Sequence, residues 1–446
     1  MARKVASPES IRATHAHETT LDRSPGLTPA IPQDRLFHLD VVRGFALLGV
    51  LLCNIHFWFR APRGRQNLSV PTWPGLADQA TAWLVRALLD TKFIFLFSIL
   101  FGVAMAIQAG RAEAQGARFR GLAVRRMLVL AGIGLLHVLL LWNGEILLPY
   151  AVLGLVALPF LQRSPRTLWR WVFGLWLLVL VLVLVGPVKT LLGPRPAWLG
   201  LEGIQANDLD EMETIERLAS HYQAASWLAV ARFRIEDYWR VLKEAIPAFF
   251  LLFTNMLTGM ALWRSGLLRD PEADRPALRR LVLWALPLGL ALHAIYASKF
   301  LLRALGRELP WSVSRFFPLM TDLSMMAGAL ILSLAMGAGL LLLLGNIRWR
   351  ARLAPLAPLG RTALSAYLMQ SLVMTGVFYG WGLGYYDRMG PLAGVLLGLA
   401  LFAVQVALAI WWTRRFRFGP VEWAWRCAAY GRVQPFRESV PGPKRS

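Results

Sequence analysis

Polar side chains interrupt the first apolar stretch of the sequence, which reads HLDVVRGFALLGVLLCNIH. Asp40 and Arg43 are three residues apart, and Asn54 follows Arg43 by eleven residues, so all three can share one helix face. An arginine can bind an anionic ligand, and an amide in an apolar interior can donate a hydrogen bond to an oxyanion. Asp40 and Arg43 can form an ion pair. An equally good explanation is that Asp40 caps the helix and that Arg43 follows the preference of basic residues for the cytoplasmic side of the membrane. Neither explains Asn54.

Three ionisable side chains are candidates for moving a proton. His56 points away from the Asn54 face if the helix continues regularly, which favours an ordinary place at the membrane interface. His137 lies within an apolar segment, eleven residues after Arg126. Glu145 lies in the turn WNGE, and an unpaired carboxylate at a membrane boundary tends toward a raised pKa. Helix capping by Glu145 and a plain hydrogen bond from His137 are the alternatives.

Polar residues in the second half of the chain continue this pattern. Asp322 lies near the start of an apolar segment, and its partner is expected on another helix. Arg361 and Gln370 lie in the sequence PLGRTALSAYLMQS. No Cys or His cluster has the spacing of a metal site, so no metal is expected. The catalytic candidates are Asn54, His56, His137 and Glu145, and the substrate-binding candidates are Asp40, Arg43, Asp322, Arg361 and Gln370.

The elements that must position these residues are membrane-spanning helices. Of 446 residues, 56% are apolar and 17% charged, against about 25% charged in soluble domains. Apolar segments of the length needed to cross about 30 Å of hydrocarbon recur along the chain. We therefore predict an all-α, polytopic transmembrane helix bundle of about ten spans. The expected spans lie near 38–59, 93–110, 122–142, 145–161, 168–192, 245–264, 280–301, 318–344, 360–380 and 391–412.

The basic residues predict the orientation of these spans. Of 48 Lys and Arg, 30 fall in the two tails and every second connection, which places both termini in the cytoplasm. The net charge of +22 is then a topology signal facing anionic lipid, and no nucleic-acid partner is expected. The predicted parts are a disordered tail (1–34), an N-terminal bundle (35–201), a polar extracytoplasmic helical excursion (202–243), a C-terminal bundle (244–413) and a basic amphipathic cytoplasmic tail (414–446).

Several sequence pieces resemble one family. They are RLFHLDVVRGFALLGVLLCNIHFW, DTKFIFLFSILFG, HVLLLWNGEILLPYAVLG, PLGRTALSAYLMQS, FYGWGLG, RRFRFGPVEWAWR and YGRVQPFR. In this order, from Arg35 to Arg437, they are similar to the YeiB-like family of bacterial inner-membrane proteins, whose C-terminal half is a domain of unknown function. The resemblance implies a multi-pass protein of the bacterial inner (plasma) membrane.

A more distant likeness is to membrane acyltransferases of the heparan-glucosaminide N-acetyltransferase type. Their first span also has an LDxxRG-like start and an amide fourteen residues after the Asp, which corresponds here to Asp40 and Asn54. Their second span is likewise entered from an Asp, here Asp90. Those enzymes have a candidate catalytic His in the outer loop after the amide. This chain has no His in residues 60–91, and only His56 lies nearby.

Two functions fit these observations. The first is transfer of an acyl group from a cytoplasmic thioester donor, with acyl-CoA as co-substrate and no bound cofactor, to a periplasmic or lipid acceptor. Asn54 would stabilise the oxyanion, and His56 or His137 would act as base, tuned by Glu145. The second is transport of a small solute or lipid along the polar residues, with Glu145, Asp322 and the histidines as proton-coupled sites. Motifs of nucleotide-binding proteins, zinc proteases and potassium channels do not occur in the sequence. The sequence does not indicate an oligomeric state.

Overall fold

The computed structural model describes residues 36–62, 73–116, 119–192, 201–304 and 316–437. In this part of the chain the structure is helical, apart from one antiparallel bridge between Phe416 and Arg437. The first eight α-helices are α1 (Phe37–Asn54), α2 (Leu76–Leu88), α3 (Lys92–Ala114), α4 (Phe119–Leu140), α5 (Leu147–Val156), α6 (Pro165–Leu192), α7 (Leu201–Tyr222) and α8 (Trp227–Glu244). The others are α9 (Ile246–Arg264), α10 (Arg275–Ala304), α12 (Phe317–Leu344), α13 (Ile347–Leu353), α14 (Leu356–Arg361), α15 (Ala363–Phe378), α16 (Pro391–Thr413) and α17 (Pro420–Tyr430).

The all-α, polytopic bundle predicted from the sequence is confirmed. Among the described residues, seven helical segments are long and apolar enough to cross a membrane, and an eighth counts if a bent pair is one span. The seven are Phe37–Phe59, Leu76–Ala114, Phe119–Leu140, Pro165–Leu182, Arg275–Phe300, Leu319–Leu344 and Pro391–Thr413. The bent pair joins Trp227–Lys243 to Ala248–Arg264 at 70°.

Two of the ten expected spans are shorter than a bilayer is thick. In place of 145–161 the chain forms α5, whose ten residues rise about 15 Å, half of the hydrocarbon thickness. A single 3₁₀ turn that contains Pro159 follows it at Leu158–Phe160. In place of 360–380 the chain forms α15, of sixteen residues. Both short helices therefore leave irregular backbone at their ends inside the protein.

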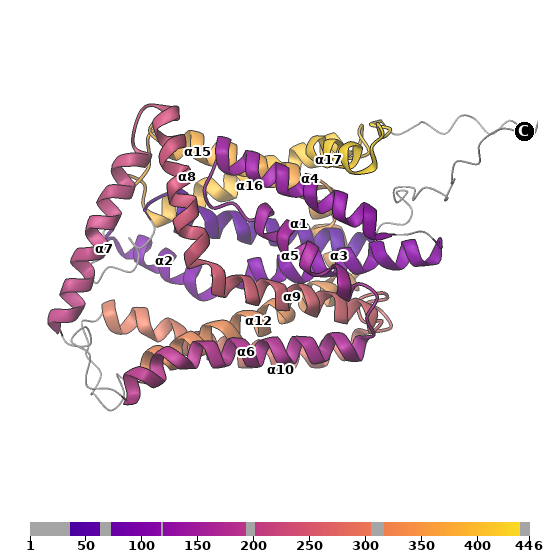
Figure 1. The fold of residues 1–446 in the computed structure, drawn as a ribbon, viewed down its shortest axis with the longest axis horizontal. Helices are drawn as coiled ribbons and strands as arrows, with labels where there is room; N and C mark the ends of the chain where they lie inside the picture. The colour runs from indigo at the N-terminus through magenta and orange to yellow at the C-terminus, as the bar shows by residue number, and fades with distance from the viewer. Residues whose placement is uncertain (1–35, 63–72, 117–118, 193–200, 305–315, 438–446) are drawn as a thin grey trace, which may run out of the picture.

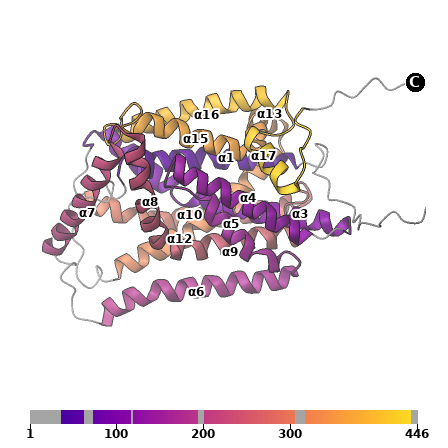
Figure 2. The same ribbon diagram turned by 45° about the horizontal axis from the view of Figure 1, so that its top comes forward.

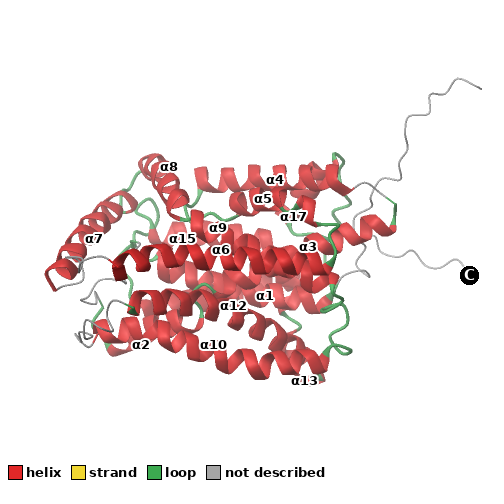
Figure 3. Ribbon diagram, turned by 60° about the horizontal axis from the view of Figure 1, so that its bottom comes forward, coloured by secondary structure: helices red, strands yellow, loops and turns green. Residues whose placement is uncertain are grey.

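The long helices run in roughly the same direction, and α1 lies among them (Figure 1). α6 forms one edge of the molecule and α16 lies at the opposite edge (Figure 2). α7 and α8 cover one end of the bundle, and α17 lies at the other (Figure 1). The view in Figure 3 shows α2 at the same end as α7. The two ends of the bundle are thus covered by helices from different parts of the chain.

Glycine lets α1 and α14 touch closely. A Cβ atom on Gly360 would overlap the backbone carbonyl of Asp40, and one on Gly44 would overlap that of Leu356. Small residues allow this kind of backbone contact between membrane helices. The contact places Arg361, the last residue of α14, beside the α1 segment that carries Arg43.

Candidate functional site

A cavity of about 570 Å³ lies inside the bundle. Its lining residues come from α1 and the π-helical turn Ile55–Phe59 that follows it, from α3, α4, α5, α8, α9, α14, α15 and α17, and from loops between these helices. Apolar side chains such as Leu47, Phe97, Leu100 and Met127 form most of its wall. This volume is within the usual range of about 300–1,000 Å³ for small-molecule sites.

Polar residues gather at two ends of this cavity. The arginine end is lined by Arg43, Arg126, Arg361 and Arg426, and the Asn54 end by Asn54, Asp90, Glu145 and Tyr238. Arg43 and Asn54 are separated by roughly 16 Å along α1, at 1.5 Å for each of eleven residues. The cavity therefore extends over about half the thickness of a bilayer.

Asn54 is the last residue of α1 and lines the cavity. A π-helical turn, Ile55–Phe59, follows it directly. His56 lies in this turn, is buried, and is not among the described side chains that line the cavity. Its ring packs edge-on against Phe57, with centroids 4.7 Å apart. The change in helix winding after Asn54 thus does not bring His56 to the amide's side.

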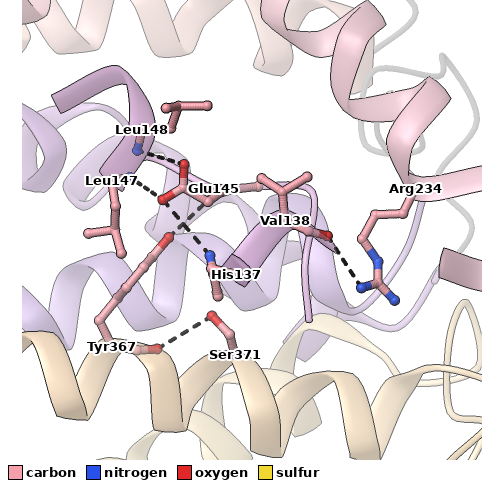
Figure 4. Close-up of polar contacts among 9 residues, drawn as sticks. His137, Val138, Glu145, Leu147, Leu148, Arg234, Tyr367 and Ser371 are labelled. Atoms are coloured by element: carbon pink, nitrogen blue, oxygen red, sulfur yellow. Dashed lines mark hydrogen bonds and ion pairs between the residues drawn. The ribbon is translucent and has the colours of Figure 1, made fainter. Parts of the chain in front are cut away.

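Glu145 faces the cavity from the loop between α4 and α5. Its carboxylate accepts hydrogen bonds from the backbone N–H groups of Leu147 and Leu148, the latter at 2.8 Å. It therefore caps α5 and lines the cavity at the same time. His137 lies behind it, with Nδ1 3.9 Å from Glu145 Oε1, and both side chains are fully buried (Figure 4). Burial raises the pKa of Glu145 to about 7, so the carboxyl group can exchange a proton near neutral pH.

Contacts from two other helices hold this loop in place. Tyr367 on α15 donates a hydrogen bond to the carbonyl of Gly144 at 3.4 Å. The buried Arg234 on α8 donates to the carbonyl of Val138 at 3.4 Å, near the end of α4 (Figure 4). It also donates to the carbonyl of Leu139 at 3.2 Å. These contacts fix the position of the Glu145 backbone.

The side chain of Asp237, also on α8, accepts hydrogen bonds from residues of the loop, of α7 and of α8 itself. Asn143 in the loop donates to its Oδ2, and so does Tyr222 of α7 at 2.7 Å, while Arg240 donates to Oδ1 at 3.0 Å. The carboxylate is buried, and these bonds satisfy both of its oxygens. The polar segment predicted as an extracytoplasmic excursion therefore fastens the loop that carries Glu145.

Asp90 precedes α3 at the same end of the cavity. Tyr296 of α10 donates a hydrogen bond to Asp90 Oδ2 at 3.0 Å. The ammonium group of Lys92 donates to the Asp90 carbonyl at 3.1 Å, and Lys92 is 1% exposed. Asp90 thus has a fixed position beside the chamber, and α10 contributes to that position.

Helix α17 forms part of the wall at the arginine end. Trp425 of α17 donates its indole N–H to the backbone carbonyl of Arg126 at 2.9 Å. Glu422 accepts hydrogen bonds from the N–H groups of Leu364 and Ser365 at 2.7 and 3.0 Å, at the N-terminus of α15. Both α17 residues line the cavity.

The cavity brings together only some of the residues predicted from the sequence. Asn54, Glu145, Arg43 and Arg361 line it. Asp40 forms an ion pair with Arg43 at 2.7 Å, and His137 contacts Glu145 from behind. His56, Asp322 and Gln370 are not among its described lining residues. Gln370 instead donates a hydrogen bond to Gln405 at 2.9 Å in the interior.

Sequence reasoning did not single out Glu422 and Arg426 at one end, or Asn143 and Tyr238 at the other. The first two lie in a segment whose Trp and Arg content is typical of a surface helix. Tyr238 lies in the polar excursion, which the hydropathy pattern places outside the bundle. A signal was present in WNGE, where Asn143 stands two residues before Glu145.

The fold and the cavity define a multi-pass membrane protein with a largely apolar internal chamber. Residues 262–432 match a family described as "Protein of unknown function (DUF418)". The chain is 33% identical over 431 residues to the "Uncharacterized protein YxaH" of Bacillus subtilis (strain 168), covering 93% of this chain and 99% of the relative. It is 30% identical over 406 residues to the "Uncharacterized protein YeiB" of Escherichia coli (strain K12), covering 88% and 96%.

The chain therefore belongs to the YeiB-like family, as its sequence pieces predicted. A third relative is the "Uncharacterized 39.9 kDa protein in amylase 3'region" of Bacillus acidopullulyticus, 27% identical over 418 residues, with 92% of this chain and 98% of the relative covered. No solved structure matches the chain with significance.

Proposed function

We propose that this protein is a membrane acyltransferase of the bacterial inner membrane, with acyl-CoA as the donor. The single observation that carries the proposal is the shared chamber: an amide and a carboxyl group line one end, and arginines line the other. The distribution of Lys and Arg assigns the arginine end to the cytoplasm, where a thioester donor is available. The acceptor is a hydroxyl or amine that reaches the Asn54 end from the lipid or the periplasm.

In the proposed reaction, Glu145 removes the proton from the acceptor hydroxyl. The acceptor oxygen forms a bond to the thioester carbonyl carbon, and the side-chain amide of Asn54 donates a hydrogen bond to the resulting oxyanion. The carbon–sulfur bond then breaks, and the proton passes from Glu145 to the leaving thiolate. His137 contacts Glu145 from the side away from the chamber, so we assign it as a positioning residue.

Transport is the second candidate, and the geometry favours it less. A proton-coupled path would use Glu145 together with Asp322 and the histidines. Of these groups, only Glu145 is among the described residues that line the chamber. Asp322 belongs to α12, which contributes no described residue to the chamber wall.

Purified protein in lipid nanodiscs, incubated with radiolabelled acetyl-CoA and a panel of lipid and glycan acceptors, tests the proposal. Wild type and the control variant Glu236→Gln, an exposed carboxylate on α8, are expected to give labelled product. The double variant Asn54→Ala/Glu145→Gln is expected to give none above background. Absence of product with every acceptor, combined with solute flux in proteoliposomes, would refute acyl transfer in favour of transport.

A further inference from the structure

We propose that the four arginines at the arginine end, with α17 as part of the site, bind the phosphate groups of the ligand that enters the chamber. This inference deepens the proposed function, because it names phosphate as the chemical feature by which the donor is recognised. Arginine suits this role, since its planar guanidinium can donate two hydrogen bonds to one phosphate.

Arg361 provides the first line of support. Arg361 lines the chamber. Its Nε and Nη2 atoms are buried and have no hydrogen-bond partner among the described residues. A buried donor without a partner costs free energy, so such donors normally have a ligand or water as their target. The close backbone contact between Gly360 and Asp40 fixes the position of the Arg361 backbone next to α1.

Two further arginines meet where α17 packs on α4. The guanidinium of Arg126 lies 4.4 Å from the ring centre of Trp425, and that of Arg426 lies 4.6 Å from the ring centre of Phe418. Contacts with aromatic faces orient a guanidinium but leave its charge in place. Burial, and then the neighbouring Arg126, lowers the pKa of Arg426 to about 10, so Arg426 is charged at neutral pH.

The carboxylates nearby leave positive charge in excess. Asp40 forms an ion pair with Arg43 and offsets the positive charge of this one arginine. Glu422 directs its oxygens to the backbone N–H groups at the start of α15 and to the Ser365 hydroxyl. An excess of positive charge in a largely apolar cavity favours an anion of matching geometry.

The apolar wall beyond the arginines then accommodates the rest of the ligand. Phe97, Leu100 and Met127 line the stretch that leads toward Asn54. A phosphate-bearing donor with an extended arm can therefore place its anionic part at the arginines and its reactive end roughly 16 Å away. Coenzyme A has this construction, whereas pantetheine has the arm without phosphate.

Calorimetric titration of purified protein in neutral phosphatidylcholine nanodiscs tests the site. Coenzyme A is expected to bind more tightly than pantetheine, with an affinity that falls as salt rises. Arg361→Gln and Arg426→Gln are each expected to weaken coenzyme A binding about 10- to 100-fold and leave pantetheine binding unchanged. Arg361→Lys keeps the positive charge but loses the guanidinium that can donate two hydrogen bonds to one phosphate, so its affinity for coenzyme A is expected to be intermediate. The matched control is Arg348→Gln, an exposed arginine on α13.

Equal affinities for coenzyme A and pantetheine, or unchanged coenzyme A binding in both Arg361→Gln and Arg426→Gln, would overturn the inference. Nanodiscs containing phosphatidylglycerol identify the source of the phosphate. Loss of coenzyme A binding there assigns the arginines to a lipid headgroup, and retained binding assigns them to the soluble donor. Arginine-dependent binding without acyl transfer refutes the proposed function alone. Acyl transfer with an unchanged KM for acyl-CoA in the arginine variants refutes the phosphate site alone.

Discussion

The helices around the chamber and the α10–α12 pair both bury polar side chains between apolar helices, but in different surroundings. Glu145 and Arg361 border an open space. His293 of α10 packs against α12 at Gly328, where a Cβ atom would lie 2.6 Å from the ring's Nδ1. Ser333 of α12 donates its hydroxyl to the Lys92 and Ala329 carbonyls, both at 2.6 Å. Burial alone therefore does not distinguish a polar group that borders free volume from one that packs between helices.

The largest expected effect separates Glu145 from other buried polar groups. Glu145→Gln keeps an oxygen that can cap α5 but removes the proposed base, so acyl transfer is expected to fall by about 10²- to 10⁴-fold. In wild type the rate is expected to rise with pH up to about 7 and then level off, because the protonated carboxyl cannot accept a proton. A pH–rate profile measures both. A wild-type rate that falls as pH rises through 7 would contradict this role.

A matched pair of amides provides the next test. Asn54→Leu is expected to lower acyl transfer about 10²- to 10³-fold, because the oxyanion loses its donor. Asn255 of α9 is also buried, has no hydrogen-bond partner for its amide within the described part of the chain, and does not line the chamber. Asn255→Leu is expected to leave the rate within about twofold and to stabilise the protein by about 1–3 kcal/mol.

Initial rates and thermal midpoints in detergent measure this pair. Equal loss of activity in Asn54→Leu and Asn255→Leu would remove the distinction between chamber and interior. A lower midpoint for Asn255→Leu would mean that this amide is satisfied in the folded protein.

Gln370 and Gln405 allow a smaller effect to be measured on stability alone. Gln370 donates to Gln405, which donates to the Ala366 carbonyl at 2.9 Å. Gln370→Leu is expected to cost about 1–3 kcal/mol, since it leaves a buried acceptor without a donor. The double variant with Gln405→Leu is expected to cost less than the two single changes together. Chemical denaturation measures the cycle, and a loss of acyl transfer in Gln370→Leu would instead support substrate binding by this residue.

The smallest expected effect concerns Asp322 of α12. Asp322→Asn is expected to change the acyl-transfer rate by less than about twofold, because the chamber wall has no described residue from α12. The acyl-transfer rates of Asp322→Asn and Glu145→Gln are measured side by side, so that the second gives the size of a full loss. A loss comparable to that of Glu145→Gln would extend the functional path into the α10–α12 pair and favour transport.

Sequence reasoning predicted the bundle well because apolar length is a local property of the chain. It predicted less well which segments span fully, since the endpoints of α5 and α15 depend on contacts with distant helices. Tyr367 and Arg234, for example, hold the loop before α5 through carbonyl groups that no sequence pattern reveals. Eleven-residue spacing correctly placed Arg43 and Asn54 on one side of α1.

The remaining site residues could not be found from spacing. Arg426 and Arg126 are 300 residues apart in sequence and meet through the packing of α17 on α4. The sequence also could not show that Glu145, rather than His137, borders the chamber, because both lie near one loop. Which of the two side chains borders the chamber depends on which side of the loop faces the space between the helices.

The participation of α17 in the chamber wall has a consequence for biosynthesis. Arg43 leaves the ribosome long before Arg426, yet both border the same cavity. Early helices must therefore wait in the bilayer with their ionic groups uncovered until α17 docks. Fusing a bulky tag directly after Tyr430, or stopping translation before Pro420, is expected to leave the arginine end without the part of its wall that α17 supplies.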